Sequence, residues 1–127
     1  RVFFVDGPGG TGKTYVFNAL LDCIRQEGEI AIAVASSGIA ALLLKGGRTA
    51  HSTFKIPLEV NNSTICDMSP RSAIASFIKR AKLIVWDECS MISKDLIAAV
   101  DRSFRDITKI DCPFGGCLMV FGGDFHP

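Results

Sequence analysis

Residues 7–14 read Gly-Pro-Gly-Gly-Thr-Gly-Lys-Thr and match the phosphate-binding pattern G-x-x-x-x-G-K-[ST]. Glycines let the backbone turn tightly and point several N–H groups at one anion, because no Cβ stands in the way. The ammonium of Lys13 is predicted to reach the outer phosphates, and the Thr14 hydroxyl to ligate Mg²⁺. A glycine-rich surface turn is the alternative interpretation. The residues predicted to bind a nucleoside triphosphate are Gly7, Gly9, Gly10, Thr11, Gly12, Lys13 and Thr14.

Two adjacent carboxylates, Asp87 and Glu88, follow the apolar stretch 83–86. An aspartate at the end of a buried strand can hold Mg²⁺ opposite Thr14, usually through a water molecule. The neighbouring glutamate can orient and deprotonate an attacking water. The alternative is an acidic turn in which either carboxylate only caps the next helix. Beside a phosphate-binding loop, the pair favours hydrolysis, with Lys13, Asp87 and Glu88 as the catalytic residues.

Alternating strands and helices must position these groups. A short apolar strand precedes the phosphate-binding pattern, and residues 30–35 are apolar throughout, which is typical of a strand buried on both faces of a parallel sheet. The polar clusters follow strands, so a parallel α/β sheet would bring them to one edge. Residues 48–55 are polar and basic with one aromatic, and 57–70 are predicted to form a surface loop. We predict strands at 2–6, 30–35, 82–86 and 117–121, and helices at 13–26, 39–44, 71–80 and 93–106, the last capped by Ser93.

The overall composition limits the remaining possibilities. The chain has 127 residues, 48% of them hydrophobic, which predicts one domain with a real core. The net charge of +1 gives no support for general binding to nucleic acids or membrane surfaces. The five cysteines fit no common zinc spacing and are interpreted as reduced thiols. No apolar run is long enough to span a bilayer, and no signal peptide is recognised. The chain starts at Arg1, so we expect a fragment of a longer protein.

Five sequence blocks together resemble the petite-integration-frequency (PIF-one-like) DNA helicases of superfamily one, including the related helicases of Helitron transposons. The first and fourth blocks are common to many ATPases, whereas the second and third are more specific. The resemblance runs along the whole chain. The blocks are Gly7 to Thr14, Ala35-Ser36-Ser37-Gly38-Ile39-Ala40-Ala41, Gly46-Gly47-Arg48-Thr49-Ala50-His51-Ser52, Asp87-Glu88-Cys89-Ser90-Met91 and Gly122-Gly123-Asp124-Phe125.

The resemblance implies a three-layer RecA-like domain, the first of two motor domains, covering residues 1–127. It implies translocation on single-stranded DNA with five-prime to three-prime polarity, driven by ATP hydrolysis with Mg²⁺ as cofactor. It also implies roles in repair, recombination and telomere maintenance, in the nucleus or the mitochondrion. Phe54 is expected either to stack on a base or to be a core side chain, and His51 either to touch DNA or to make a structural hydrogen bond. The residues expected to contact DNA are Ser36, Ser37, Gly38, Arg48, Thr49, His51 and Phe54.

One position departs from the family pattern. The family usually reads Gly-Asp-Phe-x-Gln, in which the Gln senses the γ-phosphate, but Pro127 stands at the position of the Gln. Proline has no N–H to donate. The family also has an adenine-reading segment before the position of Arg1 and an arginine finger in the second motor domain. A degenerate, transposon-derived nucleotide-binding remnant is therefore a rival hypothesis. A P-loop kinase is a weaker one, because 57–70 lacks the arginine pairs of a lid.

Overall fold

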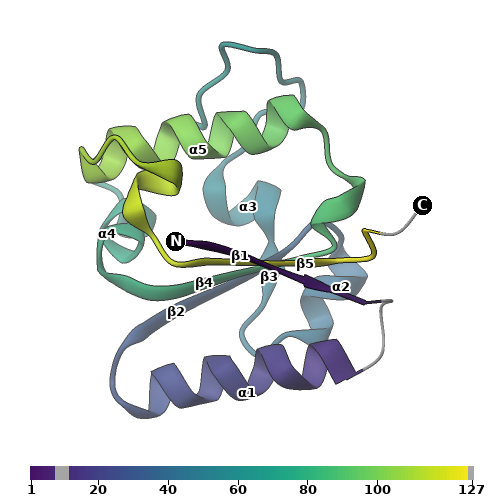
Figure 1. Cartoon of the computed structure of the whole chain (residues 1–127). Helices are drawn as coiled ribbons and strands as arrows, with labels where there is room; N and C mark the ends of the chain where they lie inside the picture. The colour runs from purple at the N-terminus through teal and green to yellow at the C-terminus, as the bar shows by residue number, and fades with distance from the viewer. Residues whose placement is uncertain (8–11, 126–127) are drawn as a thin grey trace.

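The computed structural model describes residues 1–7 and 12–125, which form one sheet of five strands with helices on both faces (Figure 1). Neighbouring strands pair in parallel, in the spatial order β1-β5-β4-β2-β3. This architecture confirms the α/β class that the alternation of strands and helices predicts. The strands are β1 (Val2–Asp6), β2 (Ile30–Ala35), β3 (Arg48–Thr49), β4 (Ala81–Asp87) and β5 (Met119–Gly123).

The helices form one layer on each face of the sheet. In Figure 1, α1 and α2 lie below the sheet, and α3, α4 and α5 lie above it. Within the described ranges, no helix is both long and apolar enough to cross a membrane. The helices are α1 (Gly12–Gln26), α2 (Gly38–Leu43), α3 (Ala50–Phe54), α4 (Ala73–Arg80) and α5 (Lys94–Thr108), with 3-10 turns at Cys89–Met91 and Pro113–Gly116.

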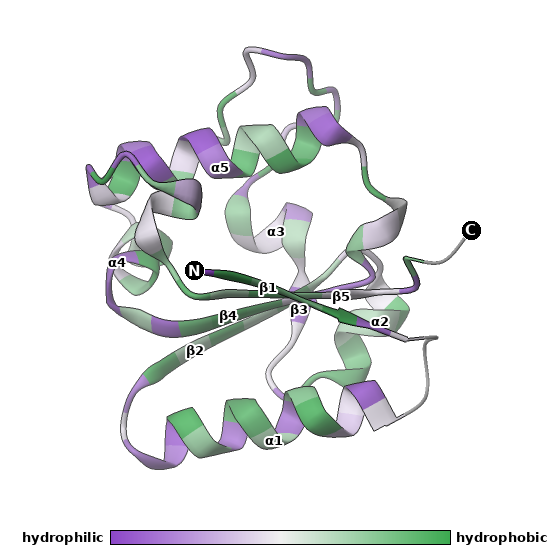
Figure 2. Cartoon of the chain, viewed as in Figure 1, coloured by the Kyte–Doolittle hydropathy of each residue, from purple (hydrophilic) through white to green (hydrophobic). Residues whose placement is uncertain are grey.

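The two faces of the sheet bury different kinds of side chain. Figure 2 shows that the strands are mostly hydrophobic, while α1 and α5 alternate hydrophobic and hydrophilic residues along their length. Successive residues of a strand point to opposite faces. In β2, Ile32 and Val34 therefore join the core above the sheet, whereas Ala31, Ala33 and Ala35 join the core below it.

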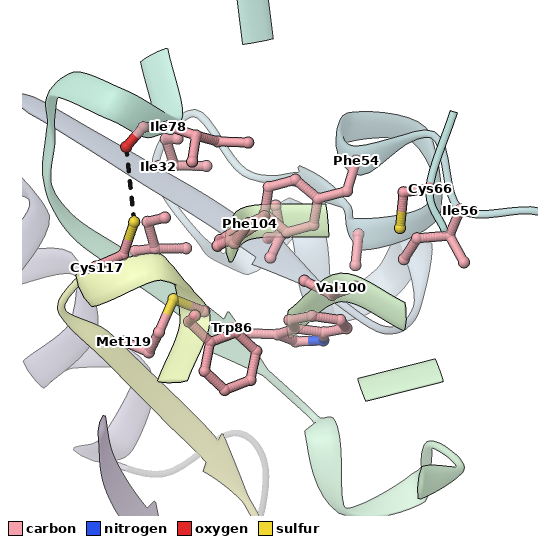
Figure 3. Packing of buried hydrophobic residues seen from close by; sticks show 14 of the residues in the cluster. Ile32, Phe54, Ile56, Cys66, Ile78, Trp86, Val100, Phe104, Cys117 and Met119 are labelled. Carbon is pink, nitrogen blue, oxygen red and sulfur yellow. Dashed lines mark hydrogen bonds between the residues drawn. The ribbon is translucent and has the colours of Figure 1, made fainter. Parts of the chain in front are cut away.

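Aromatic side chains fill the upper face (Figure 3). The ring of Phe54 in α3 lies 5.9 Å from that of Trp86 in β4 and 5.1 Å from that of Phe104 in α5, measured between ring centroids. All three side chains are fully buried. Edge-to-face and tilted aromatic pairs of this kind add about 0.5–1.5 kcal/mol each beyond the area that they bury. The upper face is therefore the main aromatic core.

Small side chains line the lower face. Besides the alanines of β2, this face contains Ala40 and Ala41 of α2, and α1 adds the fully buried Phe17 and Leu21. At Gly122 of β5, the helix approaches the strand so closely that there is no room for a side chain. A Cβ at this position would lie 2.5 Å from the Phe17 ring, closer than real Cβ contacts allow. Small residues on this face thus let α1 sit directly against the sheet.

The sequence prediction missed β3 and α3. Two strand residues and a helix of five residues are too short to show a period. The local signal is Thr49, whose Oγ1 accepts the N–H of Ser52 at 3.2 Å and so caps α3. The other predicted elements exist with bounds displaced by up to two residues. The predicted cap of α5 is confirmed, because Ser93 Oγ accepts the N–H of Leu96 at 3.2 Å.

Candidate functional site

The phosphate-binding segment joins β1 to α1, as predicted from its sequence. Gly7 follows β1, and its N–H donates to the carbonyl of Gly123 at 3.0 Å, which holds the start of the segment to the end of β5. Helix α1 begins at Gly12, one residue earlier than expected, and carries Lys13 and Thr14 in its first turn. Pro8, Gly9, Gly10 and Thr11 lie outside the described residues. The described ends of the segment thus have the expected strand-to-helix arrangement.

Lys13 and Asp87 form a buried ion pair across this edge of the sheet. The Nζ of Lys13 donates to Oδ1 of Asp87, although the two residues are 74 positions apart in the chain. Their side chains are only 3% and 5% exposed. Burying two charges is expensive even when they are paired, so such a pair is weak evidence for stability. A phosphate could replace Asp87 as the partner of Lys13.

Thr14 has the orphaned hydroxyl expected of a metal ligand. Among the described residues, none hydrogen-bonds to its buried Oγ1. Native proteins rarely leave such a group unsatisfied. Oxygen donors such as Thr14 and Asp87 suit Mg²⁺, which usually takes one or two protein ligands and fills its octahedron with phosphates and water. No cluster of three or more His, Cys, Asp or Glu side chains occurs in the described part of the chain, so a site made wholly of such ligands is not seen there.

Glu88 lies beside Asp87 with its carboxylate held by a different element. Its backbone adopts the left-handed conformation (φ 57°, ψ 39°), which is uncommon for residues other than glycine. Its N–H donates to Oδ1 of Asp87 at 2.8 Å. Its Oε1 accepts a hydrogen bond from Ser37 Oγ at 3.1 Å, and Ser37 follows β2. The turn after β4 therefore holds two carboxylates in separate hydrogen-bonding environments.

Ser36 and Ser37 link the segment after β2 to the end of β4. Ser36 Oγ accepts from Trp86 Nε1 at 2.9 Å, and the N–H of Ser36 donates to the carbonyl of Asp87 at 3.2 Å. Ser37 Oγ caps α2 by accepting the N–H of Ala40 at 3.2 Å. The sequence prediction did not include these links. Trp86 offered a signal, because a buried indole N–H needs an acceptor.

The remaining residues expected to contact DNA divide into two groups. Arg48 is exposed and Thr49 and His51 are half-buried, so a ligand can reach them. Phe54 is fully buried, with Trp86 and Phe104 against its ring. The stacking role considered for Phe54 is therefore wrong, because a base cannot reach this ring. The alternative interpretation as a core side chain is confirmed.

Cys89 is the thiol nearest in sequence to the two carboxylates. Burial raises its pKa to about 11, with the charge of Asp87 adding to the effect, while a backbone hydrogen bond and Lys13 oppose it. A nucleophilic cysteine needs a thiolate, and this group stays protonated near neutral pH. Cys89 is thus a core side chain, consistent with the prediction of reduced thiols packed inside.

The family model described as PIF1-like helicase matches residues 1–127. The chain belongs to the PIF1-like helicase family. Among similar curated proteins, "ATP-dependent DNA helicase Pif1" of Psychrobacter sp. (strain PRwf-1) is 29% identical, over 96% of this chain and 19% of its own length. The Saccharomyces cerevisiae "ATP-dependent DNA helicase RRM3" is 33% identical, over 96% of this chain and 17% of its own length. The chain thus spans about a fifth or less of these PIF1-like relatives.

Solved PIF1-like structures have the same fold. A crystal structure of Bacteroides Pif1 bound to ssDNA superposes with a TM-score of 0.83 at 32% identity, over 98% of this chain and 29% of the other. Pif1 helicase from Bacteroides in complex with ADP-AlF3 and ssDNA gives 0.81 at 31% identity, over 98% and 28%. These superpositions confirm the RecA-like, three-layer fold class.

Proposed function

We propose that this chain is the first motor domain of an ATP-dependent DNA helicase. One observation supports the proposal most strongly: the Lys13–Asp87 pair, the orphaned Thr14 hydroxyl and Glu88 meet at the edge of the sheet where Ser37 also lies. Family membership adds the class of activity, because the named relatives are ATP-dependent DNA helicases.

Hydrolysis would use the four residues at this edge in separate roles. Bound Mg²⁺, held by Thr14 and Asp87, would neutralise charge on the phosphates of ATP. The ammonium of Lys13 leaves the Asp87 carboxylate and pairs with the outer phosphates of ATP. Glu88 accepts a proton from the attacking water as the water oxygen bonds to the γ-phosphorus and the bond to ADP breaks.

Single-stranded DNA is the proposed polymer substrate. Its backbone would run over Ser36, Ser37 and Gly38 and over the segment from Arg48 to His51, where hydroxyl and guanidinium donors suit phosphate oxygens. Related Bacteroides proteins have been crystallised with ssDNA. Five-prime to three-prime translocation, and roles in repair, recombination and telomere maintenance in the nucleus or mitochondrion, complete the proposal by family resemblance.

The second motor domain is a further part of the proposal. Its arginine finger would accelerate hydrolysis roughly a thousandfold or more. We therefore expect the 127-residue chain to bind nucleotide, to hydrolyse it poorly and not to unwind DNA. Robust unwinding by this chain alone would contradict the two-domain scheme.

Nucleotide binding is tested on the chain itself with a fluorescent ATP analogue, titrated with Mg²⁺ and with EDTA. Thr14→Val removes a hydroxyl without a described partner, so folding should be unaffected while the Mg²⁺-dependent gain in affinity is lost. Thr53→Val is the matched control, because its hydroxyl is also buried and unpaired among the described residues but lies on α3. Equal affinities for wild type and Thr14→Val in Mg²⁺ would refute the metal assignment.

The competing function is a catalytically degenerate remnant, which Pro127 favours. Pro127 and His126 lie outside the described residues. A longer protein that joins this chain to a second motor domain decides between the two, by its DNA-stimulated ATPase. Lys13→Ala should abolish turnover, whereas Lys45→Ala, at an exposed lysine paired with Asp22, should not. No DNA-dependent turnover in the wild type would reject the helicase in favour of the remnant.

A further inference from the structure

The hydroxyl of Ser37 belongs to the segment proposed to contact DNA and also contacts the proposed catalytic base, Glu88. It accepts the N–H of Ala40 as the cap of α2, and it donates to Oε1 of Glu88 at 3.1 Å. A serine hydroxyl has one proton to donate. Ser37 therefore cannot donate to Glu88 and to a DNA phosphate oxygen at the same time.

The strand order shows toward which side of β4 this hydrogen bond holds Glu88. The phosphate-binding segment follows β1, and β1 and β5 lie on one side of β4. Ser37 follows β2, which lies on the other side of β4. Glu88 is thus drawn toward the β2 side, while its neighbour Asp87 pairs with Lys13.

Ser36, the neighbouring serine, makes two hydrogen bonds to β4 that hold it in place. Its Oγ accepts from the buried Trp86 indole, and its N–H is bonded to the carbonyl of Asp87. These two bonds join the end of β2 to the end of β4. The Ser37 hydroxyl can therefore donate to another acceptor without breaking the hydrogen bonds that join β2 to β4.

We propose that Ser37 is a positioning residue that holds the Glu88 carboxylate on the β2 side of β4 until DNA accepts its hydroxyl proton. Released from Ser37, the carboxylate is free to turn toward the attacking water. The inference rests on the proposed function, since it needs both Glu88 as base and DNA at the segment after β2. It supplies a reason for hydrolysis to wait for DNA.

Steady-state ATPase of the longer two-domain protein, with and without saturating single-stranded DNA, tests this role. Ser37→Gly removes the donor while glycine remains an acceptable cap. We expect DNA-free kcat to rise about tenfold, the factor that corresponds to about 1.4 kcal/mol, with the KM for ATP unchanged. The stimulation ratio, kcat with DNA over kcat without it, should fall by the same factor. A ratio equal to that of the wild type would overturn the proposal.

Two further variants separate positioning from mere capping. Ser37→Thr keeps both the donor and the cap, so it should restore the wild-type ratio; a Thr variant that behaves like Gly would refute the donor role. Ser72→Gly removes the equivalent cap of α4, where Ser72 Oγ accepts the N–H of Ala75 at 3.2 Å, and should leave the ratio unchanged. A matching change in this variant would assign the effect to helix capping.

Glu88→Gln distinguishes failure of this inference from failure of the proposed function. The amide can still accept from Ser37 but is not a base, so DNA-stimulated turnover should be lost. If Glu88→Gln keeps full turnover, the base assignment itself is wrong, and the inference falls with it. If Glu88→Gln is inactive but Ser37→Gly keeps the wild-type ratio, only the positioning role is rejected.

Discussion

The two faces of the sheet achieve close packing in opposite ways. Above the sheet, large rings such as Phe54 and Trp86 fill the space between strands and helices. Below it, alanines of β2 and α2 keep the helices close to the strands, and Gly122 makes room for Phe17. The helix that carries Lys13 and Thr14 belongs to the alanine-lined face. The difference suggests that one face supplies stability and the other sets the position of the nucleotide-binding helix.

This comparison predicts opposite sensitivities. The aromatic face should suffer most when atoms are removed, and the alanine-lined face when atoms are added. The hydrogen bond between Ser36 and Trp86 should show a smaller effect. Titration of the buried Cys89 thiol should change stability only at alkaline pH.

Phe54→Ala should have the largest effect. Truncating a fully buried phenylalanine leaves a cavity and typically lowers the free energy of unfolding by about 3–5 kcal/mol. Chemical denaturation followed by far-UV circular dichroism measures the loss. Phe3→Ala is the matched control, because Phe3 on β1 is 49% exposed and should lose much less. Equal losses for the two variants would contradict the role of the aromatic face.

Ala33→Leu tests the opposite face. Ala33 is buried in the centre of β2, and extra methyl groups there should push α1 away, lowering stability by about 1–3 kcal/mol. The same change at Ala19, which is exposed on α1, should stay within about 0.5 kcal/mol. Thermal unfolding compares the pair. A tolerated leucine at position 33 would show that the lower face has spare room.

Ser36→Ala removes the acceptor of the Trp86 indole N–H. The fully buried donor then lacks its partner, although water can reach half-buried Ser36 and replace the hydroxyl in part. We expect a loss of about 1 kcal/mol in the free energy of unfolding, with a shift in tryptophan fluorescence. Ser76→Ala, at an exposed serine of α4, serves as control. An unchanged spectrum would mean that the indole bond contributes nothing.

Cys89 should make stability depend on alkaline pH. Burial raises its pKa from 9.0 to about 11, so above pH 9.0 the unfolded chain loses this proton before the folded one does. The contribution is complete below pH 9.0 and is lost as the pH rises to about 11. Urea denaturation at pH 8 and about pH 10.5 should show the fall, and Cys89→Ala should reduce it. Cys23→Ala, at an exposed thiol, should not change the slope.

The sequence predicts the fold well where the pattern is long or chemically strict. Apolar β2 and the Gly-rich sequence before α1 have patterns that few other structures tolerate, and the capping chemistry of Ser93 predicts the start of α5. The sequence does not predict β3 and α3, because their seven residues are too few to show a hydrophobic period. The role of Phe54 could not be settled, because an aromatic in a polar stretch fits either a base or a core. Hydrogen bonds such as Ser37 to Glu88 join residues 51 positions apart and depend on strand order, which no local pattern encodes.

The pairing of β1 has a consequence for synthesis on the ribosome. Among the described strands, β1 hydrogen-bonds only to β5, with Val2 opposite Met119. At about 5–20 residues per second, β1 waits roughly 6–25 s for its partner to be translated. During this time its exposed aromatic residues, Phe3 and Phe4, lack the neighbour that aligns them. The strand that precedes the nucleotide-binding segment therefore completes its pairing only after the residues up to β5 have been made.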